Sequence, residues 1–472
     1  MMRGLTVALA ACLAGCSLQP RYVPPALPIP ASWPVGDPYL RQSEAALPTV
    51  SYRQVFADPR LQTLIGQALV NNRDLRVAAA NILAARAQYR IQRAQRLPQV
   101  DASGRYAHTG GNGASSGSGS SASSHDNYTV DVGVTAFELD LFGRVRSLSD
   151  AALNRYFATE AAGRATRLTL IADVAEAWLT YATDASLLQI ARDTAVSADS
   201  SVRLTAARLK GGVAPRTDLR QAQTVLATAQ ADIASLRTAV AQDQNALQLL
   251  LGAPVDPALL PASIEDASKG LTTLPVGLSS TVLLRRPDVV QAEYLLRASN
   301  AEIGAARAAL FPTISLTGAL GYASTSLSSL FTGGAFSYSV APSVSFPIFR
   351  GGAGIAGVAY SRAQRDAALA AYEKAVQAGF TETANALARQ GTIADELAAR
   401  QTELVAADDT FHLTDARYRG GADTFLNSLL AQRALYAAQQ SRVATQLSAA
   451  VNRVELYRAI GGDDTAEPGR TP

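Results

Sequence analysis

The most regular pattern of apolar positions lies in residues 219–250, where they recur at alternating spacings of three and four. Asp243 is the one polar member of a stripe that otherwise consists of Leu219, Ala222, Leu226, Ala229, Ile233, Leu236, Val240, Leu247 and Leu250. Such a heptad stripe predicts a long helix that packs against a second helix. The partner precedes it, because only Gly163 weakens a helical pattern from residue 145 to residue 209. At 1.5 Å per residue, that helix spans about 97 Å.

A short turn signal separates the two predicted helices. Gly211 and Gly212 suit the end of one helix, and Pro215 suits the first turn of the next. Residues 145–250 therefore predict a helical hairpin with its tip near residues 210–216.

The second half of the chain repeats this organisation. Gly420 and Gly421 follow Gly211 and Gly212 at an offset of 209, and two further pairs recur 214 apart, namely Asp74 with Asp288 and Pro98 with Pro312. A period this long indicates duplication of a whole structural unit. It predicts a second hairpin over residues 352–460, although its heptads are less regular.

Four runs of alternating apolar and polar residues lie between the helical segments, at about 99–108, 128–138, 313–322 and 336–346. Period two over about ten residues fits transmembrane β-barrel strands. A water-facing antiparallel sheet gives the same alternation, and Pro342 argues against a central strand at that position. An open sheet in lipid leaves edge amides unpaired, so membrane strands predict an oligomer that shares one barrel.

These patterns divide the chain into six segments. Residues 1–15 form a signal peptide and residues 16–57 an extended N-terminal segment. The first repeat is 58–252, with a helix before its strands, and the second is 276–460, with a helix at 288–310. The linker 253–275 joins the repeats, and 461–472 form a flexible tail.

The N-terminus has the features of a bacterial export signal, with Arg3 before a short apolar stretch that ends in Leu13-Ala14-Gly15-Cys16. This ending looks like a lipobox, in which Cys16 is acylated and becomes the first mature residue. Ser17 follows where lipoproteins of the inner membrane carry Asp, which implies the outer membrane. The mature chain then holds one lipidated cysteine, so no disulfide is expected.

Overall charge and hydropathy bear on two further classes, nucleic-acid-binding proteins and proteins with transmembrane helices. A net charge of +3 gives no basis for nucleic-acid binding. After the signal, no window holds about 18 continuous apolar residues, so no transmembrane helix is expected.

The run after the linker resembles the signature of the outer membrane efflux proteins, which are TolC-like channels. The matching residues are Arg285-Arg286-Pro287-Asp288-Val289, Gln291-Ala292-Glu293, Ile303-Gly304-Ala305-Ala306-Arg307, Phe311-Pro312, and the RYxxG stretch from Arg417 to Gly421. With the lipobox, the chain is similar to the lipoprotein branch of the OprM/NodT type. The resemblance covers nearly the whole mature chain.

The resemblance implies a homotrimer in which each chain gives four strands to one twelve-stranded outer-membrane barrel, continued by a periplasmic helical tunnel. It implies a passive exit duct for efflux, anchored to the outer membrane at Cys16. The implied partners are a periplasmic adaptor and an inner-membrane pump of the RND type, with no cofactor. A duct for type I secretion and an adaptor-type lipoprotein are the alternatives.

The resemblance also implies roles for the two tips, 210–218 and 418–430, which dock the adaptor and close the periplasmic end. Gly211, Gly212, Gly420 and Gly421 are the docking candidates, and Asp218, Tyr418, Asp423, Leu426 and Leu430 are the gate candidates. Leu430 stands where the family carries an aspartate and Asn427 where TolC has an acidic residue. This pattern predicts a leucine gate, and the alternative is that Leu426 and Leu430 are hairpin seam residues.

Two motifs suggest chemistry that their surroundings do not support. Gly352, Gly354 and Gly357 match the dinucleotide fingerprint, but a helical pattern of about sixty residues follows with no second strand. The G-x-S-x-G match at 113–117 lies in a Ser/Gly tract without flanking strand or helix. His108, His125 and His412 show no metal-ligand spacing. An enzyme is the other class considered, only because lipoprotein anchors also carry cell-wall enzymes.

Overall fold

The computed structural model describes residues 17–30, 32–34, 39, 51–110, 125–272 and 280–462. The lipidation candidate Cys16 and the G-x-S-x-G match lie outside these residues. The chain forms two compact units: unit one comprises Met1–Ala26, Asn81–Glu160 and Gln291–Tyr372, and unit two comprises Leu27–Ala80, Ala161–Val290 and Glu373–Pro472. Both units take segments from both repeats, because long helices pass from one unit into the other.

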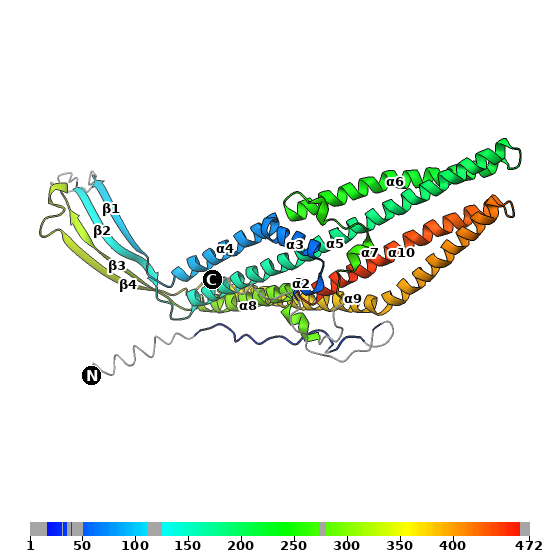
Figure 1. Ribbon diagram of the computed structural model, residues 1–472. Coiled ribbons are helices and arrows are strands. Elements are labelled where there is room, and N and C mark those ends of the chain that lie inside the picture. The colour runs from blue at the N-terminus through cyan, green and yellow to red at the C-terminus, as the bar shows by residue number, and fades with distance from the viewer. Residues whose placement is uncertain are drawn as a thin grey trace. The chain divides into compact units, whose positions relative to one another are not determined.

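Two long helical hairpins dominate the chain (Figure 1). The first pairs α5 (Arg144–Lys210) with α6 (Arg216–Leu251), and the second pairs α9 (Ala353–Arg419) with α10 (Phe425–Ala459). Together with four strands, they confirm the predicted fold class. Every position of the predicted stripe on α6 is buried or partly buried, which shows that the heptad marks its packing face.

Unit one contains a four-stranded antiparallel sheet in the order β1-β2-β3-β4. Its strands are β1 (Val100–Thr109), β2 (His125–Glu138), β3 (Thr313–Ser324) and β4 (Phe336–Ser345). β1 and β4 are the edges of this sheet within one chain. Pro342 lies on the edge strand β4 opposite Leu316, where its missing N–H is tolerated.

A bulge interrupts the β2–β3 pairing between Val134 and Phe137. Within it, Ala136 has a φ of 49°, and its N–H donates to Thr317 Oγ1 at 3.2 Å. A left-handed conformation at a residue with a Cβ is unfavourable, so the hydrogen bond helps to hold the bend at this point of the strand.

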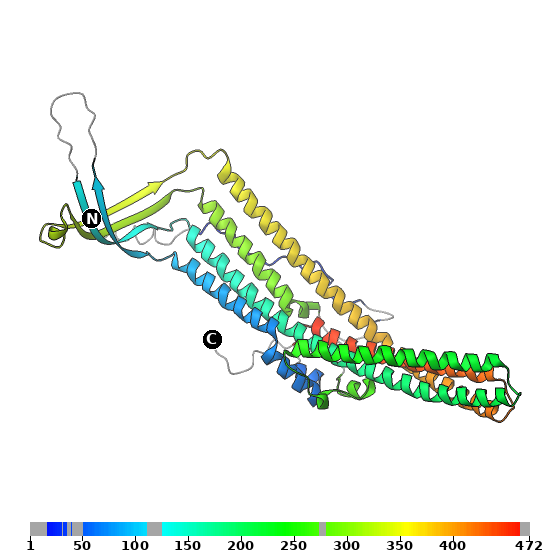
Figure 2. The same cartoon turned by 90° about the horizontal axis from the view of Figure 1, so that it is seen from above.

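The helix segments of unit one lie side by side in one layer, in the order α4, α5, α8, α9 (Figure 2). Here α4 is Arg73–Ala94 and α8 is Pro287–Ala308. Phe157 of α5 contacts Tyr294 of α8 with ring centroids 5.3 Å apart, and Arg155 pairs with Glu302. The layer repeats the order of the strands because each helix segment is next to its strand in sequence.

The core of unit two packs α5, α6, α9 and α10 around short elements: α2 (Tyr52–Val55), α3 (Pro59–Asn71), η1 (Pro257–Leu259) and α7 (Ile264–Ser268). Trp178 is fully buried there, and its indole N–H donates to Leu259 O at 3.0 Å. α2 lies in the segment expected to be extended, so that expectation was wrong for its last residues. A capping box built by Ser51 and Gln54 favours this single turn.

The Arg-Arg-Pro-Asp run has a structural role at the start of α8. Arg286 is buried, and its guanidinium binds Asp288 and Glu382 at 2.8 Å each and donates to Ala459 O at 3.1 Å. A buried arginine needs such compensation. It therefore ties the segment after η2 (Ser280–Arg285) to both α9 and α10.

The glycine run that resembled a nucleotide loop forms the junction between β4 and α9. Gly351 and Gly352 have φ of 56° and 87°, and α9 then continues unbroken to Arg419, which leaves no βαβ unit. η3 (Leu327–Ser329) lies in the connection between β3 and β4. None of the helices in the described ranges has the length and apolarity required to span a membrane.

Candidate functional site at the hairpin tips

The two hairpin turns have the same backbone geometry. Gly212 and Gly421 have φ of 68° and 77°. In the first turn, Val213 N donates to Arg208 O, and in the second, Ala422 N donates to Arg417 O. This is the Schellman pattern that ends a helix on a left-handed residue. Glycine is therefore required at the second position of each pair.

The other glycine of each pair is under no such constraint. A Cβ on Gly211 would meet its nearest atoms at 3.6 Å, and one on Gly420 would do so at 3.4 Å. Of the four docking candidates, Gly212 and Gly421 thus shape the turns, whereas Gly211 and Gly420 directly follow α5 and α9 and still donate helical hydrogen bonds, to Ala207 O and Ala416 O.

Asp218 lies in the first turn of α6, where a carboxylate interacts favourably with the helix dipole. Its backbone N–H donates to Pro215 O at 3.2 Å. The side chain is partly exposed. Asp218 therefore stabilises the start of α6.

Tyr418 is buried and connects the two hairpins rather than facing solvent. Arg208, from the end of α5, lies over its ring with 4.2 Å between Cζ and the ring centroid. The same guanidinium donates to Tyr418 O at 2.9 Å and to Arg419 O at 3.1 Å. Arg208 thus supplies a positive charge to the C-terminal end of α9, where the helix dipole favours it.

A small apolar cluster supports this connection. Phe425 contacts the Tyr418 ring with centroids 5.4 Å apart, and Ala222 and Leu429 complete the buried cluster. Burial raises the pKa of Tyr418, against the opposing effect of Arg208. The cluster brings together α6, α9 and α10, with partly buried residues of α5 packed against it.

Asp423 is held by its immediate neighbours. Its Oδ1 accepts from Thr424 N at 2.7 Å and from Asn427 Nδ2 at 2.8 Å, and its Oδ2 lies 3.3 Å from Arg417 Nε. These interactions, led by the Thr424 N–H, lower the pKa of Asp423. The carboxylate is therefore occupied in starting α10.

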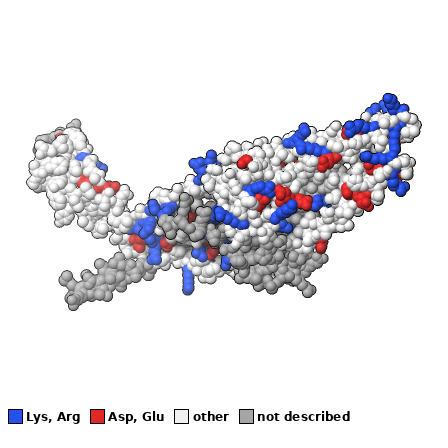
Figure 3. Space-filling view, viewed as in Figure 1, with Lys and Arg blue, Asp and Glu red and all other residues white. Residues whose placement is uncertain are grey.

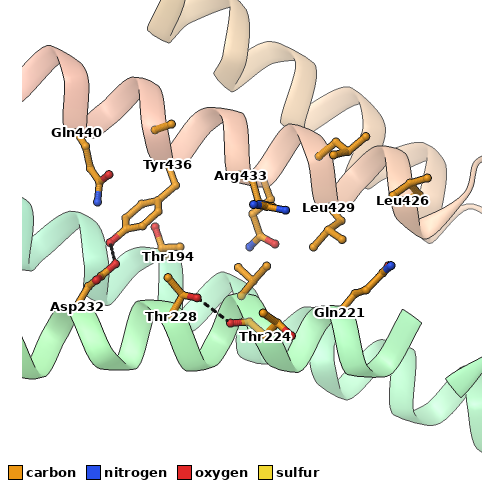
Figure 4. Close-up of a pocket in the computed structure, with 14 residues that line it drawn as sticks. Thr194, Gln221, Thr224, Thr228, Asp232, Leu426, Leu429, Arg433, Tyr436 and Gln440 are labelled. Atoms are coloured by element: carbon orange, nitrogen blue, oxygen red, sulfur yellow. Dashed lines mark hydrogen bonds between the residues drawn. The ribbon is translucent and has the colours of Figure 1, made fainter. Parts of the chain in front are cut away.

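Leu426 and Leu430 differ from their neighbour Leu429. Leu429 is 5% exposed, whereas Leu426 and Leu430 are 50% and 52% exposed. All three line a cavity of about 580 Å³ between α6 and α10, opposite Gln221 and other polar residues of α6 (Figure 4). The seam position is thus Leu429, and the two candidate gate residues lie beside it.

Two residues that line this cavity form a hydrogen bond that sequence reasoning missed. Tyr436 Oη donates to Asp232 Oδ2 at 2.7 Å, which joins α10 to α6 (Figure 4). Burial and this carboxylate raise the pKa of Tyr436. Arg208 was missed as well, although its place in the last turn of a helix, before Lys210 and two glycines, was a usable signal.

Cationic side chains gather at the hairpin ends. Figure 3 shows Lys and Arg atoms concentrated there, and the last turns of α5 and α9 carry Arg208, Lys210, Arg417 and Arg419. Asp415, Asp218 and Asp423 offset only part of this charge. Among the described residues, no three or more His, Cys, Asp or Glu side chains are grouped to hold a metal ion.

Comparison with known proteins decides the family. The profile of the outer membrane efflux protein family matches residues 64–253 and 278–462. The chain belongs to this family. It is 42% identical over 452 residues to a probable efflux pump outer membrane protein, TtgC of Pseudomonas putida, covering 95% of this chain and 93% of that protein.

Solved structures agree with this membership. The chain is similar to CusC, with a TM-score of 0.85 and 36% identity over 95% of this chain and all of that one. It is also similar to the open state of the MtrE outer membrane channel of Neisseria gonorrhoeae, with a TM-score of 0.84 and 34% identity over 95% and 98%. The resemblance inferred from the Arg-Arg-Pro-Asp run is thereby confirmed.

Proposed function

We propose that this outer membrane efflux protein is the passive exit duct of a tripartite efflux system, assembled as a homotrimer. The observation that carries the proposal is the open four-stranded sheet, whose edges β1 and β4 have no partner within the described chain. In lipid such edges must be paired. Three copies of four strands close one barrel of twelve.

The two faces of the sheet support a wall between lipid and water. On β4, one face carries Phe336, Tyr338, Val340 and Val344, which are 57–77% exposed in the single chain. The opposite face is polar: Ser103 Oγ donates to Asp131, and Ser315 Oγ lies 2.7 Å from Ser343 Oγ. An apolar outer band and a hydroxyl-rich inner face are what a barrel with an aqueous lumen needs.

The tips are the docking site for the periplasmic adaptor, which links the duct to an inner-membrane pump of the RND type. The cationic ends of α5 and α9 favour an adaptor surface with acidic residues. Acylation at Cys16 adds a lipid anchor in the outer membrane. A single chain of myristoyl size anchors only marginally, so the barrel itself retains the protein.

The gate is a ring of leucines rather than of carboxylates. Leu426 and Leu430 are half-exposed because Leu429 already fills the hairpin seam, which leaves them available to meet their copies in a trimer. Burying one leucine contributes roughly 1.5 to 3 kcal/mol, and an apolar constriction gates by dewetting. Asp423 is held by Arg417 and Asn427, so it is poorly placed to bind a cation.

Single-channel recording in planar bilayers tests both the exit duct and the leucine gate. The purified trimer should insert and show low resting conductance with little block by millimolar divalent cations. Leu430→Ser should raise the conductance, whereas Asp423→Asn and the control Leu249→Ser, on an exposed part of α6, should change it little. Absence of any channel would refute the duct. A cation-blocked channel, or one unchanged by Leu430→Ser, would refute the leucine gate alone.

A further inference from the structure

The first mature residues lie along α8 in unit one, and four side chains of that helix hold them. Arg307 donates to Leu18 O at 3.2 Å, and Asn300 donates to Pro20 O at 2.8 Å. The segment runs antiparallel to α8, because later residues of the segment meet earlier residues of the helix. It forms the start of the dark-blue trace, which Figure 1 shows most clearly. We call residues Ser17–Tyr22 the strap.

Tyr22 fixes the end of the strap. Its hydroxyl donates to Glu293 Oε1 at 3.2 Å, and Arg297 lies over its ring with 5.0 Å between Cζ and the centroid. Arg297 also binds Glu293 at 2.6 Å. Burial, with a contribution from Glu293, raises the pKa of Tyr22 to about 12, so the phenol remains a hydrogen-bond donor throughout the physiological range.

Gly304 sets the position of the strap along the helix. A Cβ on this residue would lie 2.8 Å from Gln19 Cα and 2.7 Å from Ser147 Oγ of α5. Both distances are too short for real contacts, so the backbone of the strap can approach α8 only at a glycine. The partners on α8 share one face, with spacings of four and three, at Glu293, Arg297, Asn300, Gly304 and Arg307.

Two features indicate that the strap docks on α8 in one register and does not pack against it non-specifically. The strap is bound through its own main-chain carbonyls, at Leu18 and Pro20, which fixes the backbone directly. Pro20 lies within the strap, and Pro24 and Pro25 follow it closely. These prolines favour an extended form, so less conformational entropy is lost when the strap binds. Three residues of the signature run, Glu293, Gly304 and Arg307, thus contact the strap in this chain.

We propose that the strap is a positioning device that fixes the acylated N-terminus beside the point where the chain enters the sheet. This inference rests on the acylation of Cys16 in the proposed function. Leu18 is held by Arg307, and β3 begins six residues later at Thr313. Leu18 is two positions after residue 16, so chain connectivity keeps the Cα atoms of the two residues within about 7 Å of each other.

A docked strap has a consequence for assembly of the barrel. A lipid held this close keeps the first residues of β3 near the membrane surface before any barrel exists. The short tether raises the effective concentration of the β3–β4 hairpin at the bilayer. A docked strap should therefore speed barrel assembly only when the N-terminus carries lipid.

A two-by-two experiment on the full-length chain tests this coupling. One factor is the strap: Asn300→Leu with Arg307→Met removes both carbonyl contacts, and Tyr22→Phe independently removes the hydrogen bond to Glu293. The other factor is the lipid, removed with a non-lipoprotein signal and Cys16→Ala. Pulse–chase labelling measures how fast denaturant-resistant trimers appear in the outer membrane, and mass spectrometry of the N-terminal peptide reports acylation. The controls are Arg21→Gln, within the strap, and Val23→Ser, directly after it, because both side chains are exposed.

In the lipidated protein, the strap variants should slow trimer formation about tenfold, as expected when a tether loses its fixed geometry, and the controls should not. In the lipid-free protein, the strap variants should add nothing further. An equal slowing in both backgrounds would show that the strap is packing alone and would overturn the inference. So would an unchanged rate, or an N-terminal peptide without lipid. None of these results affects the duct itself, because channel conductance reports on it separately.

Discussion

The second helices of the two hairpins have nearly equal length but very different surroundings. α6 has 36 residues and buries four of them, whereas α10 has 35 residues and buries fifteen. The clean heptad occurs on α6, the helix that packs along one stripe. α10 is covered on several faces, so apolar and small polar residues are spread around it and the period is blurred. A regular stripe thus indicates a helix that buries a single face, not the better-packed helix.

The largest expected effect comes from truncating the same residue type on the two helices. Leu429→Ala removes a buried side chain from the tip cluster with Tyr418 and Phe425, and we expect a loss of about 2 to 5 kcal/mol. Leu249→Ala, at a position on α6 that is 79% exposed, should cost less than about 0.5 kcal/mol. Unfolding in detergent, followed by circular dichroism, measures both. Equal losses would mean that the assembled trimer buries α6 as deeply as α10.

A second prediction concerns the left-handed glycine that both hairpin turns contain. Gly212→Ala and Gly421→Ala force a Cβ into a left-handed conformation, which costs roughly 1 to 2 kcal/mol in each case. Gly211→Ala and Gly420→Ala should be neutral or slightly stabilising, since neither residue has a positive φ and both still donate a helical hydrogen bond. The four melting temperatures test this directly. Unequal losses for Gly212 and Gly421 would show that the neighbouring cluster, and not the turn, governs tip stability.

Much of this architecture could be predicted because it depends on local patterns. The paired glycines predicted both turns, the alternation from Phe336 to Ser345 predicted β4, and the uninterrupted helical composition predicted α5. Each signal lies within the element that it predicts. The single turn α2 was missed because its capping box is a weak cue in a segment that is otherwise rich in proline.

The tip site and the strap could not be predicted in the same way, because they join residues far apart in sequence. Arg208 meets Tyr418 across 210 residues, and Tyr22 meets Glu293 across 271. No local pattern records such pairs. Asp423 shows the converse, since the resemblance made it a gate candidate while its local hydrogen bonds explain it as part of the start of α10.

The polar exception in the α6 stripe gives a third prediction. Asp243 faces Asp184 of α5; burial, followed by the repulsion from Asp184, raises the pKa of Asp243 to about 6. The unfolded value is about 3.9, so the folded state holds the proton more tightly. Stability from this pair is full below pH 4 and is lost as the pH rises towards 6.

Asp243→Asn should therefore match the wild type near pH 4 and exceed it at pH 7 by about 1 kcal/mol, after allowance for solvent screening. The introduced amide is neutral at both pH values and can still donate a hydrogen bond to Asp184. Melting temperatures between pH 4 and 7 measure the difference, with the exposed Asp409→Asn as the matched control. A constant difference across this range would show that the two carboxyl groups do not share a proton.

The smallest effect is expected at Asp423, where the pH dependence of stability has the opposite sign to that at Asp243. Hydrogen bonds from Thr424 and Asn427 and the ion pair with Arg417 lower the pKa of Asp423, so its contribution is present above the unfolded value of about 3.9 and is lost as the pH falls below it. Asp423→Asn should lower the melting temperature slightly at pH 7 and by less at pH 3, because protonation of the wild type at acidic pH removes the same interactions. The substitution should leave divalent block of the channel unchanged, since this carboxylate serves α10 and not a cation. If the melting temperature is unaffected at both pH values while divalent block weakens, Asp423 is an ion ligand, and the tip of α10 resembles its acidic relatives more closely than Leu430 implies.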